Sequence, residues 1–110
     1  MSEYNPDKWV IVKIKCEKNG SFYKILGDWS GGYLDSNSWR LSSPVESVTK
    51  EGDYIMFNNY SGSVYKCHKN MMTLGVMSSG IYSQMEEEAS KNDDLEVSML
   101  TLEELEEELK

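Results

Sequence analysis

The chain has 110 residues, of which 39% are hydrophobic and 11% aromatic, and its formal net charge at pH 7 is −8. This length suits a single domain, and the acidic balance argues against a conventional nucleic-acid binder, which presents a basic face. The charge is unevenly placed, because residues 1–85 hold nine Lys and Arg against eight Asp and Glu, whereas residues 86–110 hold eleven acids and two lysines.

The N-terminus lacks the basic stretch followed by an apolar run that marks a signal peptide. No apolar run approaches the roughly 20 residues that a membrane span needs. We therefore expect a cytoplasmic protein that binds no membrane and whose Cys16 and Cys67 are reduced thiols. The near-neutral body still leaves RNA binding through aromatic stacking open.

The clearest strand covers residues 9–16. Val10, Val12 and Ile14 fall on one face and alternate with the residues of the opposite face. Asn19-Gly20 follows, and this dipeptide favours a tight hairpin turn because both residues tolerate positive φ. The sequence therefore predicts a hairpin whose second strand covers residues 21–26.

Further short segments with strand character follow at intervals of about ten residues, over 38–41, 45–48, 54–57 and 63–69. Together they predict a β-rich α+β fold, in which a small antiparallel sheet or partly open barrel of four to six strands is followed by one or two C-terminal helices. We expect the first helix over residues 79–89, with Ser79 as its N-cap.

The acidic end has a pattern of its own. Alternating apolar residues predict a short edge strand over 95–99, and Thr101 with Glu104 forms a capping box at the start of a helix. We expect a domain over residues 1–90 and an acidic segment over 91–110. A helix this short is marginal in water, so its leucine stripe needs a surface to pack on.

That surface has two candidates. The stripe either covers the domain's own sheet or inserts into a groove on another protein, with the glutamates steering the encounter. In the second case the partner-binding residues are Leu102, Glu103, Glu104, Leu105, Glu107, Glu108 and Leu109.

The sequence offers little for catalysis or metal binding. Cys67 and His68 are suitable zinc ligands together with Cys16, but the paired spacing of a zinc site is missing, and neighbours on a strand point to opposite faces. The same geometry argues against a cysteine–histidine catalytic pair. We therefore predict no catalytic residues, no metal and no cofactor.

The Gly- and Ser-rich connection over residues 27–44 carries large aromatics, which a flexible linker lacks. Its stacking surfaces and its arginine could hold a nucleobase or a small ligand, with the arginine at a phosphate. The predicted ligand-binding residues are Asp28, Trp29, Tyr33, Trp39 and Arg40. The alternative is that both tryptophans close the hydrophobic core and that Arg40 pairs with Asp28 or Asp35.

The run from Gly27 to Val45, followed by Gly52-Asp53-Tyr54 and by residues 61–69, resembles small accessory proteins of T-even-type bacteriophages. The resemblance covers residues 8–85. It implies an early host-takeover, tRNA-processing or anti-defence factor in the cytoplasm of an infected bacterium, often a non-enzymatic inhibitor. It assigns no site residues.

Two hypotheses follow. The first is a non-enzymatic, phage-type modulator that binds and inhibits or redirects a host protein through its acidic C-terminal element. The second is an RNA-, tRNA- or nucleotide-binding accessory module that uses the aromatic Gly/Ser loop. It would bind through Trp29, Trp39 and Arg40 together with Tyr65, and the acidic tail would act as an autoinhibitor.

Overall fold

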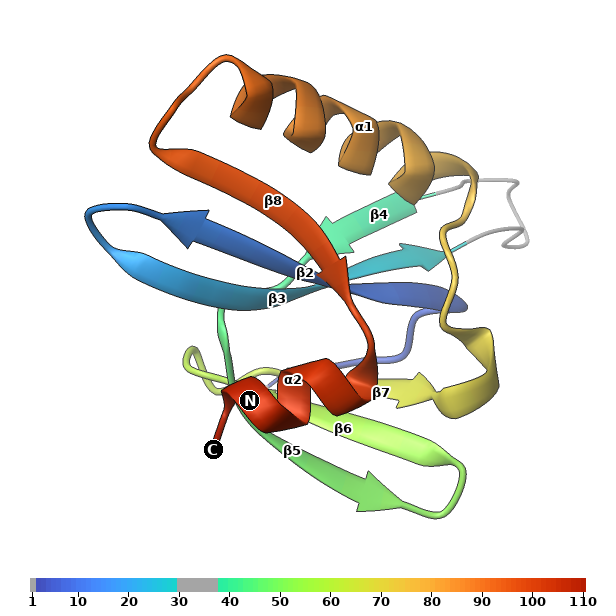
Figure 1. Cartoon of the computed structure of the whole chain (residues 1–110). Helices are drawn as coiled ribbons and strands as arrows, with labels where there is room; N and C mark the ends of the chain where they lie inside the picture. Colours follow the sequence, from blue (N-terminus) through green and yellow to red (C-terminus); the bar gives the residue numbers. More distant parts are fainter. Residues whose placement is uncertain (1, 30–37) are drawn as a thin grey trace.

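A computed structural model describes residues 2–29 and 38–110, and within them it confirms a β-rich α+β fold of two four-stranded sheets and two α-helices (Figure 1). The strands are β1 (Glu3–Tyr4), β2 (Lys8–Cys16), β3 (Gly20–Trp29), β4 (Ser38–Leu41), β5 (Val45–Glu51), β6 (Tyr54–Asn59), β7 (Val64–His68) and β8 (Leu95–Leu100). The helices are α1 (Val76–Ser90) and α2 (Leu102–Glu108), and a 3-10 turn covers Lys69–Met71.

The two sheets form successive layers, with strand orders β4-β3-β2-β8 and β1-β7-β6-β5. Helix α1 covers the outer face of the first sheet, and α2 lies beside the gap between the two sheets (Figure 1). All pairings among the described strands are antiparallel except that of β1 with β7. The predicted hairpin is present, and Gly20 has φ 84° at its turn.

Strand β2 is buried on both faces over its first half. Trp9 and Ile11 face the second sheet, whereas Val10 and Val12 face helix α1. All four side chains are less than 9% exposed. The β4-β3-β2-β8 sheet is therefore the middle layer of the molecule, and each of its faces needs a cover.

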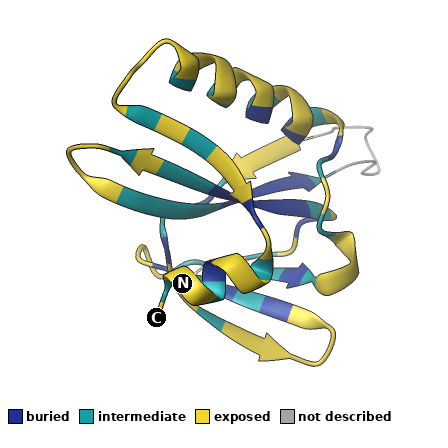
Figure 2. Ribbon diagram, viewed as in Figure 1, coloured by how far each residue is buried: buried dark blue, intermediate teal, exposed yellow. Residues whose placement is uncertain are grey.

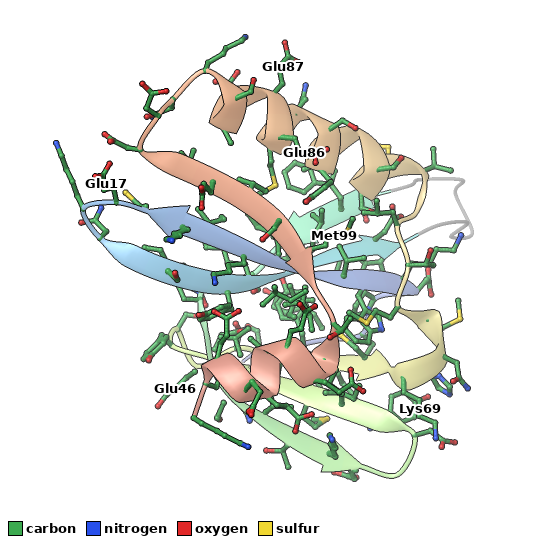
Figure 3. The ribbon with its side chains drawn as sticks, in the orientation of Figure 1. Glu17, Glu46, Lys69, Glu86, Glu87 and Met99 are labelled. Atoms are coloured by element: carbon green, nitrogen blue, oxygen red, sulfur yellow. The ribbon has the colours of Figure 1, made fainter. Side chains whose placement is uncertain are left out.

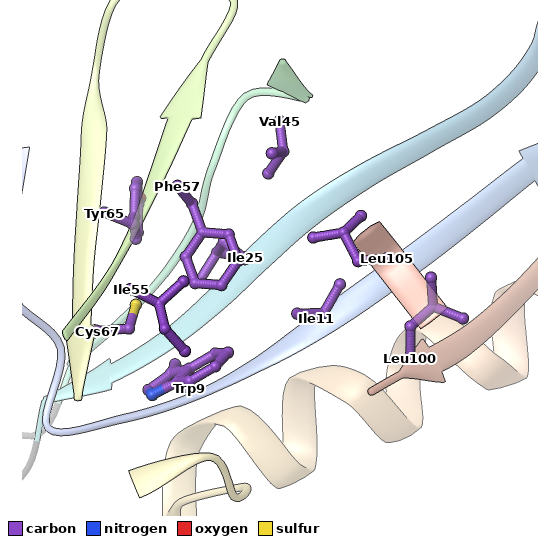
Figure 4. Close-up of a cluster of buried hydrophobic side chains, with 10 residues drawn as sticks. All are labelled: Trp9, Ile11, Ile25, Val45, Ile55, Phe57, Tyr65, Cys67, Leu100 and Leu105. Carbon is purple, nitrogen blue, oxygen red and sulfur yellow. The ribbon is translucent and has the colours of Figure 1, made fainter. Parts of the chain in front are cut away.

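The main core fills the space between the two sheets (Figure 4). Its buried members are Trp9, Ile11, Ile25, Val45, Ile55, Phe57, Tyr65, Cys67, Leu100 and Leu105. Trp9 packs against Phe57 with ring centroids 5.2 Å apart, and its indole N–H donates to the His68 carbonyl at 2.9 Å. The polar tip of the largest core side chain is thereby satisfied, as burial requires.

Strand β5 contains an irregularity that explains its imperfect alternation. The pairing register with β6 shifts between Val45 and Ser47. A bulge adds a residue to one strand, so Val45 and Val48 both pack on the main core although they are three positions apart.

The acidic end is built into the fold. Strand β8 pairs with β2 from Ile11–Leu100 to Cys16–Leu95 and forms the edge of the middle sheet. The predicted capping box of α2 is present: the Glu104 N–H donates to Thr101 Oγ1 at 3.1 Å, and the Thr101 N–H donates to Glu104 Oε1 at 2.8 Å.

The leucine stripe of α2 docks on its own domain. Leu105 is fully buried in the main core beside Leu100, whereas Leu102 and Leu109 pack at its margin. The outward side of α2 is exposed (Figure 2). The leucine stripe therefore packs on the domain's own sheets and not, in this structure, in a groove on another protein.

Glu108 ties α2 to the middle sheet. Its Oε1 accepts hydrogen bonds from Lys13 Nζ at 2.6 Å and from the Tyr23 hydroxyl at 2.7 Å. These bonds, that of Lys13 first, hold the pKa of Glu108 below its usual value, and the same carboxylate raises the pKa of Lys13.

The first prediction concerns the docking of α2. Leu105→Ala should lower the free energy of unfolding by about 2–5 kcal/mol, because it opens a cavity in the main core. Leu109→Ala, on the same helix but only half-buried, is the matched control and should cost distinctly less. Urea denaturation of the full chain measures both values, and equal small losses would contradict the docking of α2 on its own domain.

The second prediction concerns pH. Because folding lowers the pKa of Glu108, its contribution is present above the unfolded pKa of about 4.3 and is lost as the pH falls through the folded pKa. Glu108→Gln should therefore cost up to about 1 kcal/mol at pH 7, the usual limit for a surface pair. The difference from the parent chain should vanish at low pH.

The control for Glu108 is Glu107→Gln, since Glu107 pairs with Lys110 on its own chain end at 3.4 Å and does not reach the sheet. Thermal unfolding followed by circular dichroism between pH 2 and pH 7 measures the effect. A loss that persists unchanged at pH 2 would contradict the role of the Glu108 carboxylate.

Candidate functional site

The structure separates the residues predicted to form one ligand site. Strand β4 places Trp39 opposite Asp28 and Arg40 opposite Gly27 on β3. Paired residues share a face, and successive residues alternate between faces. Trp39 and Asp28 therefore lie on the α1 side of the middle sheet, whereas Arg40 and Trp29 lie on the side of the second sheet.

The alternation of the predicted 38–41 strand was the signal that could have shown this separation. Trp29 is half-buried and packs edge-on against Tyr4, with ring centroids 6.5 Å apart. Trp39 is 41% exposed. Tyr33 lies outside the described residues. The alternative in which both tryptophans close the core therefore holds in part for Trp29 and not for Trp39.

Asp28 has a structural position. It is 1% exposed, and its Oδ2 accepts a hydrogen bond from the Ser78 N–H at 2.8 Å in the first turn of α1. The helix begins after Gly75 and not at Ser79 as expected. A Cβ atom at position 75 would overlap the Asp28 carboxylate, so glycine is needed there. A carboxylate at a helix N-terminus is favourable because the exposed N–H groups and the helix dipole are positive.

An apolar groove lies between α1 and the middle sheet on the side where Trp39 is exposed. Its volume is about 380 Å³. It is lined by Ile14, Trp39, Leu41, Ile81, Gln84, Met85, Glu88, Leu95 and Val97, which come from β2, β4, α1 and β8. Leu41, Met85 and Val97 are only half-buried. The groove therefore offers apolar surface that the fold leaves partly uncovered.

The groove exists because α1 is narrower than the sheet beneath it. Tyr82 and Ser78 are the buried residues of α1, and Tyr82 packs with Val10, Val12 and Leu26 over the middle strands. The lining residues surround this small second core.

One carboxylate, that of Glu88, belongs to the wall of the groove. A separate hollow is lined by Lys15, Glu17, Asp93, Asp94 and Glu96. Lys15 pairs with Glu96, and both alternate with groove residues Ile14, Leu95 and Val97, so this hollow opens on the opposite face of the middle sheet. Glu87 projects from the outer side of α1, and Glu17 lies at the tip of the β2–β3 hairpin (Figure 3). Lys91 is bound to Glu87 at 3.5 Å.

The residues predicted to bind a partner through α2 divide into two groups. Leu105 has no exposed surface, and Leu102 and Leu109 are half-buried, because all three pack on the protein's own core. Glu103, Glu104 and Glu107 are exposed, and Glu108 is held by Lys13 and Tyr23. The carboxylates of α2 thus remain accessible to a partner, whereas Leu105, at the centre of its leucine stripe, does not.

The cysteine and histidine residues do not converge. Cys67 is fully buried in the main core, and burial raises the pKa of its thiol well above the usual value. His68 lies on the opposite face of β7, where its Nδ1 accepts from the Asn70 N–H at 3.1 Å. Among residues 2–29 and 38–110, no three His, Cys, Asp or Glu side chains are arranged to hold a metal ion.

Comparisons with known proteins do not place the chain in a family. No protein-family model, no curated protein and no solved structure matches it. In the part of the chain that the structure describes, neither helix combines the length and apolar character needed to cross a membrane.

The third prediction tests the role of Asp28. Asp28→Ala should lower the free energy of unfolding by about 1–3 kcal/mol, because it removes the partner of a buried N–H at the start of α1. Thermal unfolding measures the loss, and Asp93→Ala, at an exposed aspartate in the connection between α1 and β8, is the comparison. An unchanged stability would contradict the capping role.

Proposed function

We propose that this chain is a non-enzymatic, protein-binding module whose groove accepts an apolar segment flanked by basic residues on a partner protein. The observation that carries the proposal is an apolar groove with the Glu88 carboxylate in its wall and the exposed carboxylates of Glu86 and Glu87 on the same helix. The proposal keeps the acidic C-terminal part of the chain as the partner-binding element but moves the apolar contact from α2 to the groove between α1, β4 and β8.

The apolar lining of the groove would supply most of the affinity for the partner segment. A volume of about 380 Å³ lies within the range of pockets that hold small ligands or inserted side chains. Trp39 stands at the edge with 41% of its surface exposed, and tryptophan is enriched among the residues that dominate binding energy at interfaces. Covering Trp39, Met85 and Val97 would remove apolar surface from water.

The charge supplies selectivity for the partner. Carboxylates near an interface steer a basic partner toward it and disfavour an acidic one. Two copies of this chain would bring the same carboxylates together, so like-charge repulsion argues against self-association through the groove. The exposed glutamates of α2 strengthen the same negative field.

The resemblance to small accessory proteins of T-even-type bacteriophages gives this proposal a biological setting. In that setting the partner is a host protein, and occupation of its basic segment inhibits or redirects it. The alternative of a nucleotide-binding site built from the whole aromatic loop has less support, because its described members lie on two faces of the sheet.

The fourth prediction tests the groove. The full chain, used as bait in a bacterial lysate treated with nuclease, should capture a protein that Trp39→Ala and Met85→Asp baits lose by tenfold or more. Met99→Asp is the matched control, because Met99 is 43% exposed and does not line the groove. Circular dichroism confirms that each bait is folded.

Salt supplies a second readout on the captured protein. Raising NaCl from 50 to 500 mM should slow its association markedly while its dissociation changes little, because exposed charges act mainly on the encounter. Equal capture by all four baits, or capture that nuclease abolishes, would contradict the proposal.

A further inference from the structure

A second cavity, of about 340 Å³, lies on the other side of the middle sheet, where the β4–β5 connection meets β7 and the N-terminus. Its wall consists mainly of hydroxyl groups together with Tyr4, Tyr65 and Arg40. Among the described residues that line it, none carries a carboxylate. In a chain of net charge −8, the described part of this lining carries one cation and no acid.

Arg40 is the chain's only arginine, and it is available to a ligand. Its guanidinium lies over the ring of Tyr4, 4.5 Å from the ring centroid. Within the described residues it forms no ion pair with a carboxylate. A guanidinium carries five N–H donors in a planar fork that matches phosphate and carboxylate oxygens.

Tyr65 adds a buried donor to the same wall. Its side chain is 1% exposed, yet within residues 2–29 and 38–110 its hydroxyl has no hydrogen-bond partner. Burial raises the pKa of Tyr65 to about 12, and the nearby Arg40 guanidinium opposes this rise through both its positive charge and its N–H groups. The phenol is therefore protonated at neutral pH and can donate. An unpaired buried hydroxyl is costly, and a ligand acceptor would remove that cost.

A row of serine hydroxyls completes the wall. Asn59 Nδ2 donates to Ser63 Oγ at 3.0 Å, Ser63 and Ser61 hydroxyls are 3.0 Å apart, and Ser61 and Ser43 hydroxyls are 2.7 Å apart. The two serine–serine bonds use two of the three hydroxyl protons. One proton therefore remains to be donated, at Ser43, Ser61 or Ser63, and all three residues line the cavity.

We propose that this cavity binds the phosphate group of a small phosphate monoester. Arg40, the Tyr65 hydroxyl and the serine row are all donors, and they surround one space of which no described lining residue carries a carboxylate. The cavity exceeds the volume of a phosphate ion alone, so an organic group of about the size of a sugar fits beside it. The site is independent of the protein-binding groove, since Arg40 and Trp39 point to opposite faces of β4.

The experiment uses the single arginine of the full chain. Its Nε–Hε group gives one ¹H–¹⁵N signal, which is followed by NMR during titration with inorganic phosphate, ribose 5-phosphate, adenosine 5′-monophosphate and adenosine. A saturable shift with either monoester and none with adenosine would support the site. A shift with inorganic phosphate alone would overturn the monoester, and no saturable shift below about 10 mM with any anion would overturn the site itself.

Tyr65→Phe separates a binding role from a structural one. It should weaken monoester binding about tenfold, the usual effect of losing one hydrogen bond to a charged group. It should not lower stability in urea, because the hydroxyl it removes is unpaired. Arg40→Gln should weaken binding at least as strongly, as judged by the signals of the serine N–H groups.

Lys66→Gln is the matched control, because Lys66 also lies over a tyrosine ring, that of Tyr54 at 4.9 Å, outside the cavity. It should leave monoester binding unchanged. Equal weakening by Lys66→Gln and Arg40→Gln would show a response to total charge and would overturn the proposed site.

Discussion

The two-sided burial of strand β2 is the constraint on which the rest of the structure depends. Trp9 and Ile11 on one face and Val10 and Val12 on the other are all withdrawn from water. A single layer of secondary structure can cover only one of these two faces, so the chain supplies two. The second sheet and α2 cover one face, and α1 covers the other. Both candidate sites lie where a cover ends, the groove at the edge of α1 and the hydroxyl-lined cavity at the edge of the second sheet.

The concentration of acid in residues 86–110 is compatible with this fold because most of the apolar residues among the acids point inward. Leu100 and Leu105 enter the main core, and Val97 faces the second core. The carboxylates remain at the surface, where Lys13 and Lys50 bind two of them at 2.6 and 3.2 Å. The segment is thus both a structural element and the source of the negative surface, and its charge does not require it to be an appended tail.

Local features of the fold could be predicted from the sequence, whereas the sites could not. The Asn19-Gly20 hairpin and the Thr101–Glu104 capping box depend on neighbouring residues, and both are present. Strand β1 has two residues and no alternation to reveal it. Asp28 meets Ser78 across 50 positions, and no local pattern records such a contact.

The same distance in sequence hid the composition of both sites. The hydroxyl row joins Ser43 to Ser61, 18 positions further on. Arg40 on β4 meets Tyr4 on β1, a strand of the other sheet. What the sequence did contain was Trp39 next to Arg40 in a predicted strand. Alternation alone assigns such neighbours to different surfaces, so the two residues belong to two sites and not to one.

The register of β4 therefore decides which site each of these residues serves. A slip of one residue would turn every side chain of β4 to the other face and would place the Arg40 charge against the apolar groove. Ser42 opposes this slip, since its N–H donates to the Ile25 carbonyl at 2.9 Å and its Oγ accepts from the Ile25 N–H at 2.8 Å. Ser42 is 4% exposed, so losing either bond would leave a buried group unpaired. One buried serine next to the strand thus keeps Trp39 at the apolar groove and Arg40 at the hydroxyl-lined cavity.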